Sequence, residues 1–201
     1  MRPPNSGARN GLGRRTLLAA LAGAAVVRTD LARADEALIR IGYIRSTDRH
    51  PTISLLDQPT QDDGLAGAKL AIDDNNTTGS FMGQKFELID VRVHADADLG
   101  AALAKATDEG ARFVLTDLPA ADVLKLSDAA HASGAVILNI AAPDVSLREQ
   151  DCRANVIHVA PSRDMLADAV GQYLVWKKWT RWLLVSGSHP DDMLLADAYR
   201  R

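Results

Sequence analysis

Hydrophobic positions along the chain change their spacing several times, and each change marks the boundary of a predicted element. Between Leu65 and Ile72 apolar residues recur every three to four positions, which indicates an amphipathic helix. The polar stretch 73–79 follows, and its Asp, Asn and Gly residues favour turns, so we expect the helix to end there. Short apolar strands are predicted on either side of this helix, at 39–44 and 85–93. A strand, a helix and a strand in this order require a parallel sheet.

The same alternation of strands and helices continues to the end of the chain. Gly110 and Gly134 stand where two helices should stop, because glycine tolerates the left-handed conformation of a helix C-cap. Asp96 or Asp98 can cap the first of these helices, and Pro119 can open the second. The predicted elements are a helix up to Gly110, a strand at 112–115, a helix from Pro119 to Gly134, strands at 135–140 and 155–159, a helix at 161–174, a strand at 181–185 and a helix at 191–201.

A domain boundary is predicted at Ala160, where the alternation restarts after a loose loop. Residues 35–160 form the first lobe, and 161–201 form only the start of a second. Because no strand is predicted after the last helix, we expect a fragment or an incomplete product, the alternative being a whole product with a decayed second lobe. The strands that would return to the first sheet would also be missing, which predicts an open edge and exposed apolar surface.

The composition is that of a folded protein and argues against nucleic-acid binding. Of the 201 residues, 47% are hydrophobic, which is enough for a substantial core. The net charge of -3 provides no basic field, and Lys and Arg form no long run after residue 40. We therefore expect no nucleic-acid partner.

Segment 1–34 differs in kind from the rest and resembles an export signal. The pair Arg14-Arg15 precedes an apolar run at 17–27, and Ala32 and Ala34 supply small residues before a cleavage site. The arginine pair is typical of a twin-arginine signal, although a general secretory signal fits nearly as well. About eleven apolar residues are too few for the roughly 20 of a spanning helix. We expect cleavage after Ala34 and a periplasmic protein.

No residues form a recognised catalytic, cofactor or metal site. The five histidines lack the HExxH spacing of a zinc site, and no GxSxG elbow, phosphate loop or GxGxxG follows a predicted strand. The pairs Asp62-Asp63 and Asp73-Asp74 stand at predicted helix ends, where capping and solvation explain them. Three tryptophans at 176, 179 and 182 could form a stacking platform, but we expect them to cover the edge of a core.

Several motifs together resemble one protein family. Ile41-Gly42-Tyr43, the segment GAKLAIDDNN at 67–76, and Gly79, Gly83 and Lys85 are similar to the start of periplasmic solute-binding proteins of the branched-chain amino acid type, which feed ABC transporters. The similarity spans essentially the whole mature chain. Within this family, DNNTTG at 74–79, DCRAN at 151–155, APSRDMLADA at 160–169 and the later KKWTRWLLV resemble the branch associated with PQQ-dependent alcohol catabolism.

The resemblance implies an α/β protein with the type I periplasmic-binding fold, which has two doubly wound parallel-sheet lobes, here with the second lobe truncated. It implies a monomer without a cofactor that captures a small polar solute between the lobes and passes it to an ABC permease in the inner membrane. Ligands of open parallel sheets bind beyond the carboxyl ends of the strands. The ligand-binding candidates are accordingly Asp117, Ala120, Asn139, Ala141, Ala142, Pro143 and Asp191.

Three of these positions depart from the amino-acid binders of the family. Those proteins hold the ligand's carboxylate with a hydroxyl residue after the third strand and a threonine after the fourth, but Ala120 and Pro143 match these positions here. Asp191 matches a second-lobe residue that is commonly aromatic. A hydrogen bond to a charged group is worth roughly 1.5 to 3 kcal/mol, so we predict a less charged solute than a branched-chain amino acid.

Three functional classes follow from these observations. The first is an importer's solute receptor, with a branched-chain amino acid binder as its variant; the second is a ligand-sensing ectodomain of the same fold. The third is an enzyme on a doubly wound sheet, which would need a nucleophile and a base that the sequence does not supply. A spanning helix after the second lobe would indicate sensing. A sugar-binding repressor would begin with a DNA-reading helix pair, where this chain has its export signal.

Overall fold

The structure is a computed structural model that describes residues 36–47, 56, 60 and 62–201. The predicted export signal at 1–34 lies outside the described residues.

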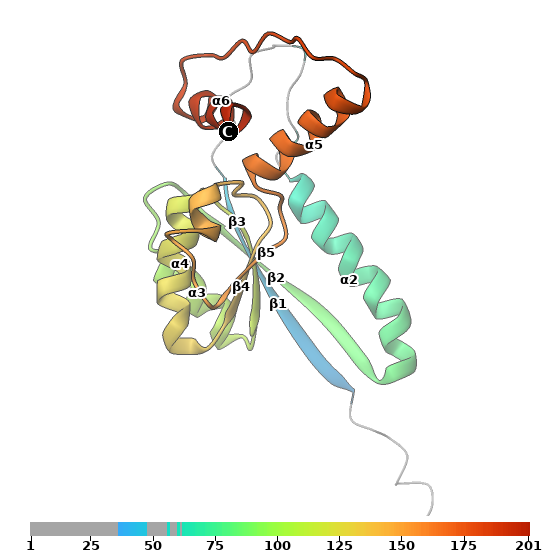
Figure 1. The fold of residues 1–201 in the computed structure, drawn as a ribbon. Coiled ribbons are helices and arrows are strands. Elements are labelled where there is room, and N and C mark those ends of the chain that lie inside the picture. Colours follow the sequence, from blue (N-terminus) through green and yellow to red (C-terminus); the bar gives the residue numbers. More distant parts are fainter. Residues whose placement is uncertain (1–35, 48–55, 57–59, 61) are drawn as a thin grey trace, which may run out of the picture. The chain divides into compact units, whose positions relative to one another are not determined.

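Five strands form one sheet with the order β2-β1-β3-β4-β5 (Figure 1). Pairing is parallel between β1 and β3, β3 and β4, and β4 and β5. β1 and β2 also run in the same direction, because Arg40 pairs with Glu87 near their starts and the amide of Thr47 donates to the carbonyl of Val93 at their ends. The predicted parallel α/β sheet is confirmed. The strands are β1 (Ala37–Ser46), β2 (Gln84–Val93), β3 (Phe113–Asp117), β4 (Val136–Asn139) and β5 (Val156–His158).

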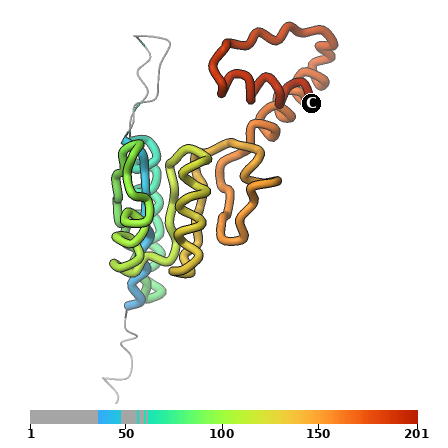
Figure 2. Tube along the Cα trace, turned by 90° about the vertical axis from the view of Figure 1, so that its left-hand side faces the viewer, coloured from blue at the N-terminus to red at the C-terminus, as the bar shows by residue number. Residues whose placement is uncertain are grey.

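Helices cover the sheet on both sides. Figure 1 shows α2 on one side and α3 with α4 on the other. Neighbouring residues of β1 point to these two layers, since Gly42 faces Ala106 of α3 whereas Tyr43 meets Gly64 of α2. Figure 2 shows α5 and α6 joined by an extended segment. The helices are α2 (Asp63–Met82), α3 (Leu99–Asp108), α4 (Ala120–Ser133), the 3-10 turn η1 (Val145–Arg148), α5 (Arg163–Trp176) and α6 (Pro190–Arg200).

The core lies between the sheet and the layer of α3 and α4. Ile44, Val114 and Ile137 of three adjacent strands have no exposed surface, and neither do Val123 and Leu126 of α4. Burying each of these side chains contributes about 1.5 to 3 kcal/mol. The sheet is therefore held most firmly at β1, β3 and β4. The carboxyl ends of these three strands carry the residues of the candidate site.

The predicted boundaries of α3 and α4 are confirmed by their caps. The side chain of Asp98 accepts hydrogen bonds from two amides in the first turn of α3. Gly110 and Gly134 have φ angles of 97° and 67°, the left-handed region that favours glycine. Local sequence signals were sufficient here because each cap is made by residues close in sequence.

The prediction that the first helix ends at 73–79 is wrong, because α2 continues to Met82 and ends at Gly83 with a φ of 65°. The side chain of Asn75 donates to the carbonyl of Ala71 at 2.7 Å and so bonds inside the helix. Asn76 forms two hydrogen bonds with the backbone of Phe86 in β2, of 3.0 and 2.7 Å. These contacts satisfy polar side chains that would otherwise favour a turn.

The strand predicted at 181–185 is also absent. This segment has no regular secondary structure, and among the described residues no strand pairs with it. A strand needs a neighbour for its ladder of hydrogen bonds, so an apolar sequence alone does not form one.

The prediction of exposed apolar surface is confirmed. Ile157 in the edge strand β5 is 54% exposed, and beyond the sheet Trp176, Leu183 and Val185 are 71%, 86% and 82% exposed. Within the described part of the chain, no helix combines the length and the apolar character that crossing a membrane requires.

Candidate ligand-binding site

The strand order places a topological switch point at the carboxyl ends of β1 and β3. The chain leaves β1 to reach β2 on one side, and later returns to β3 on the other side of β1. Connections that diverge in this way leave space between them, which is where doubly wound sheets bind ligands. The candidate site therefore consists of the residues at the ends of β1, β3 and β4.

Tyr43 of β1 and Asp117 of β3 meet at this switch point. Tyr43 has no exposed surface, and its hydroxyl donates to Oδ2 of Asp117 at 3.0 Å. Burial, together with the Asp117 carboxylate, raises the pKa of the Tyr43 phenol, which keeps the hydroxyl protonated as a donor. Asp117 was predicted as a site residue, whereas Tyr43 was quoted only as part of a family motif.

A buried ion pair lies beside them. Arg45 is only 7% exposed, and its Nε and Nη2 donate to the two carboxylate oxygens of Asp90 at 3.0 and 3.3 Å. Burial alone would raise the pKa of Asp90, but the hydrogen bonds from Arg45 and Arg92 outweigh it and hold that pKa below its usual range. This pair fixes the end of β1 against β2, and no local sequence pattern predicts it because helix α2 separates Arg45 from Asp90 in the chain.

Asn139 shapes the loop after β4. It has no exposed surface; its Oδ1 accepts from the amides of Ala141 at 3.2 Å and Ala142 at 2.9 Å. Its Nδ2 donates to the carbonyl of Ala142 at 2.8 Å. The predicted candidates Asn139, Ala141, Ala142 and Pro143 are thus brought together, and the Asn139 amide is used to hold the loop.

Ala120 lies in the neighbouring loop region, as the first residue of α4. β3 and β4 are adjacent, with Thr116 paired to Asn139, so the loops carrying Ala120 and Pro143 emerge side by side. Neither residue carries a side-chain hydrogen-bond donor. The hydrogen-bonding groups available to a ligand at this edge of the sheet are therefore backbone groups and the Asp117 carboxylate.

Asp191 is connected to the same loop through Arg163, which is not among the predicted site residues. Arg163, whose side chain is 13% exposed, pairs with Asp144 at 3.0 Å and with Asp191 at 3.1 Å. The Arg163 amide also donates to the carbonyl of Pro143 at 2.8 Å. Arg163 therefore joins the loop after β4 to the start of α6.

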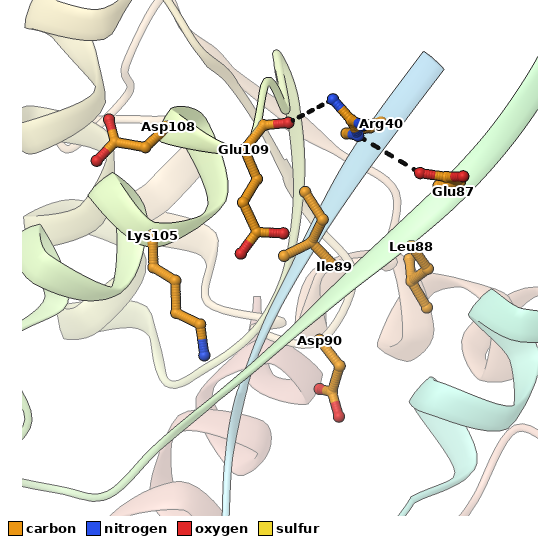
Figure 3. A pocket seen from close by; sticks show the side chains of 8 residues that line it. All are labelled: Arg40, Glu87, Leu88, Ile89, Asp90, Lys105, Asp108 and Glu109. Atoms are coloured by element: carbon orange, nitrogen blue, oxygen red, sulfur yellow. Dashed lines mark hydrogen bonds and ion pairs between the residues drawn. The ribbon is translucent and has the colours of Figure 1, made fainter. Parts of the chain in front are cut away.

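A polar hollow of about 560 Å³ lies elsewhere on the lobe, between the starts of β1 and β2 and the end of α3 (Figure 3). There Arg40 bonds to Glu87 at 3.4 Å and to the carbonyl of Glu109 at 3.0 Å. Lys105 and Asp108 complete its charged wall. This hollow lies toward the amino ends of the strands, whereas ligands of open parallel sheets bind beyond the carboxyl ends, so it is not the candidate ligand site.

A second, more apolar hollow of about 530 Å³ lies between α5 and α6 and is lined by Trp176, Trp182 and Tyr199. The prediction that the tryptophans cover the edge of a core is wrong, since Trp176, Trp179 and Trp182 are 71%, 57% and 52% exposed. Other aromatic rings lie beside them; for example, the ring centroids of Trp182 and Tyr199 are 6.1 Å apart. Over the described residues, no sheet lies beneath them to be covered.

No group of three or more His, Cys, Asp or Glu side chains in the described part of the chain could hold a metal ion.

Solved structures of known proteins share this fold. An ABC transporter substrate-binding protein from Desulfitobacterium hafniense is similar, with 23% identity, a TM-score of 0.59, and 81% of this chain and 46% of that chain covered. Its complex with Leu gives a TM-score of 0.55 at 23% identity, covering 82% of this chain and 46% of that one. A leucine-, isoleucine-, valine-, threonine- and alanine-binding protein from Brucella ovis has 14% identity and a TM-score of 0.57, covering 81% of this chain and 43% of that chain.

The chain thus spans about half the length of these solved structures, which corresponds to one lobe. A comparison with curated proteins finds no match. The family model described as "Periplasmic binding protein" matches residues 56–201. Because this match covers most of the sequence, the chain belongs to the periplasmic binding protein family, whose members are non-enzymatic components of transporters.

Proposed function

We propose that this chain forms the first lobe of an extracytoplasmic solute receptor that delivers a small polar solute to an ABC permease in the inner membrane. The observation that carries the proposal is the family match over residues 56–201. The strand order supports it, because the loops after β3 and β4 emerge at the edge where such sheets bind ligands. In this proposal residues 1–34 direct export and are removed after Ala34, residues 35–160 are the first lobe, and 161–201 begin the second.

In this proposal the lobe positions hydrogen-bonding groups around the solute and catalyses no reaction. Arg163 links the loop after β4 to α6, so a solute seated against that loop would also bias the segment that leads into the second lobe. The solute is held between lobes by shape and hydrogen bonds and leaves unchanged when they separate. The chain acts as a monomer in this scheme and needs no cofactor.

We further propose that the solute is not a branched-chain amino acid. Ala120 and Pro143 lack the hydroxyl groups that would hold a carboxylate, and the Asn139 amide is engaged by the loop itself. The Asp117 carboxylate at the same edge would repel an anionic group but can accept a hydrogen bond from a hydroxyl. A neutral hydroxyl compound fits these groups, in keeping with the sequence resemblance to the branch linked to PQQ-dependent alcohol catabolism.

Calorimetric titration of the full-length protein with L-leucine, and separately with a panel of neutral short-chain alcohols and diols, tests the proposal. We expect heat of binding from a member of the neutral panel and none from leucine. Leucine binding at micromolar concentration would contradict the proposed solute class, and the absence of binding to any compound of either kind would contradict the proposed receptor.

A gain-of-binding variant tests the reason for this selectivity. The double substitution Ala120→Ser and Pro143→Thr restores both hydroxyl groups, and each restored bond should strengthen leucine binding by roughly ten- to a hundredfold. Ala121→Ser is the matched control, because Ala121 is the exposed neighbour in the same helical turn. If the control gains leucine binding as strongly as the double variant, the assignment of these two positions is wrong.

A further inference from the structure

His158, at the end of β5, is held in a single tautomer by two neighbours. Its Nδ1 lies 3.1 Å from Nδ2 of Asn139, and its Nε2 lies 3.1 Å from the carbonyl of Leu147. The Asn139 amide cannot be reversed, because its Oδ1 accepts from two loop amides while its Nδ2 donates to a loop carbonyl. Asn139 is therefore the donor to Nδ1, so Nε2 carries the hydrogen and the ring is neutral.

The surroundings of the ring disfavour a second proton. Arg148 of η1 is the charged group that acts on His158, and the other partners of the ring are the neutral Asn139 of β4 and the Leu147 carbonyl of η1. Arg148 donates to the carbonyl of Ala160, and its Nη1 is buried without a hydrogen-bond partner among the described residues. Burial and the Arg148 charge together lower the pKa of His158, whereas its bond to Leu147 raises it in part.

We propose that His158 and Asn139 form an acid-sensitive latch that positions the loop at 141–143 and releases it when the imidazole takes up a proton. The latch depends on the proposed function in one respect: that function gives the loop at 141–143 a solute to bind. Both residues act through the loop backbone and are positioning residues. The carboxyl ends of β4 and β5 lie side by side, with Asn139 paired to His158 in the parallel register, so the latch joins the candidate loop to the strand that leads into α5.

The release follows from the count of donors. A proton from solvent on Nδ1 places a donor against the Nδ2 donor of Asn139, and it adds a positive charge beside Arg148. The ring can move away, which removes one of Asn139's partners, or the amide can rotate, which breaks its three bonds to the backbone of Ala141 and Ala142. Either response loosens the loop.

Nuclear magnetic resonance on the full chain tests the latch without a solute. The ring signals of His158 and the hydrogen-exchange protection of the Ala141 and Ala142 amides are followed from about pH 7.5 to about pH 5, a range that spans the ordinary histidine pKa. We expect protection of both amides to fall roughly fivefold, the equivalent of one net hydrogen bond. The midpoint of that fall should coincide with the titration of the His158 ring.

His158→Gln should remove the fall in protection, because an amide keeps the polar contact and takes up no proton. The matched control His131→Gln, in α4, should leave it unchanged. Protection that stays constant through the His158 titration, a midpoint that follows another histidine, or a fall that survives in His158→Gln would overturn the latch. If His158→Gln does not fold, the coincidence of midpoints in the wild-type chain still decides the matter. Because no solute is used, failure here is distinguishable from failure of the proposed receptor function.

Discussion

Replacing Gly64 by alanine should destabilise the protein, although alanine is the better helix former. Gly64 lies in the first turn of α2, and a Cβ placed there would overlap the Tyr43 hydroxyl and lie 3.0 Å from Oδ2 of Asp117. Tyr43 cannot swing aside easily, because its ring is fully buried and its hydroxyl bonds to Asp117. The overlap must therefore be relieved by moving α2 or by breaking that hydrogen bond.

The magnitude follows from two opposing effects. Glycine to alanine gains at most about 1 kcal/mol of helix propensity, whereas overpacking a well-filled site costs about 1 to 3 kcal/mol. The balance is a net loss of up to about 2 kcal/mol in the free energy of unfolding. Tyr43→Phe removes the overlapping oxygen and leaves the ring carbon Cζ 3.5 Å from the new Cβ, an ordinary contact. In that background Gly64→Ala should be neutral or stabilising.

Urea unfolding followed by circular dichroism measures all four members of this cycle. Gly67→Ala is the matched control, because it lies in the same helix and nothing stands within 4 Å of its added Cβ. The control should gain up to about 1 kcal/mol. If Gly64→Ala and Gly67→Ala change stability equally, or if Tyr43→Phe does not rescue Gly64→Ala, then Tyr43 does not pack against α2 as described.

Substitutions at three further positions have expected outcomes that separate packing, charge and capping. Gly79→Ala should cost more than about 2 kcal/mol in urea unfolding, because its Cβ would lie 2.6 Å from the backbone carbonyl of Gln84, which cannot rotate away. Asp90 has a lowered pKa in the folded state, so its contribution to stability is present above its ordinary pKa and is lost as the pH falls through the folded pKa. Asp90→Asn should therefore reduce the loss of unfolding free energy at acid pH. An unchanged acid dependence would contradict the ion pair between Arg45 and Asp90. Asp98→Ala should cost about 1 kcal/mol through loss of the α3 cap, whereas Asp98→Asn should cost little.

The candidate site was only partly accessible from the sequence. Asp117 and Asn139 were identified because they follow predicted strands, and positions beyond the carboxyl ends of parallel strands are the usual ligand-binding positions. Tyr43, Arg163 and His158 were not identified as site residues, although alternation along β1 could have placed Tyr43 on the face opposite Gly42. Their roles depend on partners 74, 28 and 19 residues away, and no local pattern encodes such distances.

By itself the sequence determined the alternation of strands and helices, the helix ends at Gly110 and Gly134, and membership of a parallel α/β class, because periodicity and capping act within a few residues. It left the cap of α3 open between Asp96 and Asp98, and the structure selects Asp98. The tertiary structure decided where α2 ends, since the clamp between Asn76 and Phe86 satisfies side chains that locally favour a turn. It also decided that 181–185 is not a strand, because strand formation depends on a neighbouring strand and apolar character alone does not provide one. Pairing across long stretches of chain is a property of the packed fold, and it is this pairing that brings Tyr43 to Asp117 and His158 to Asn139.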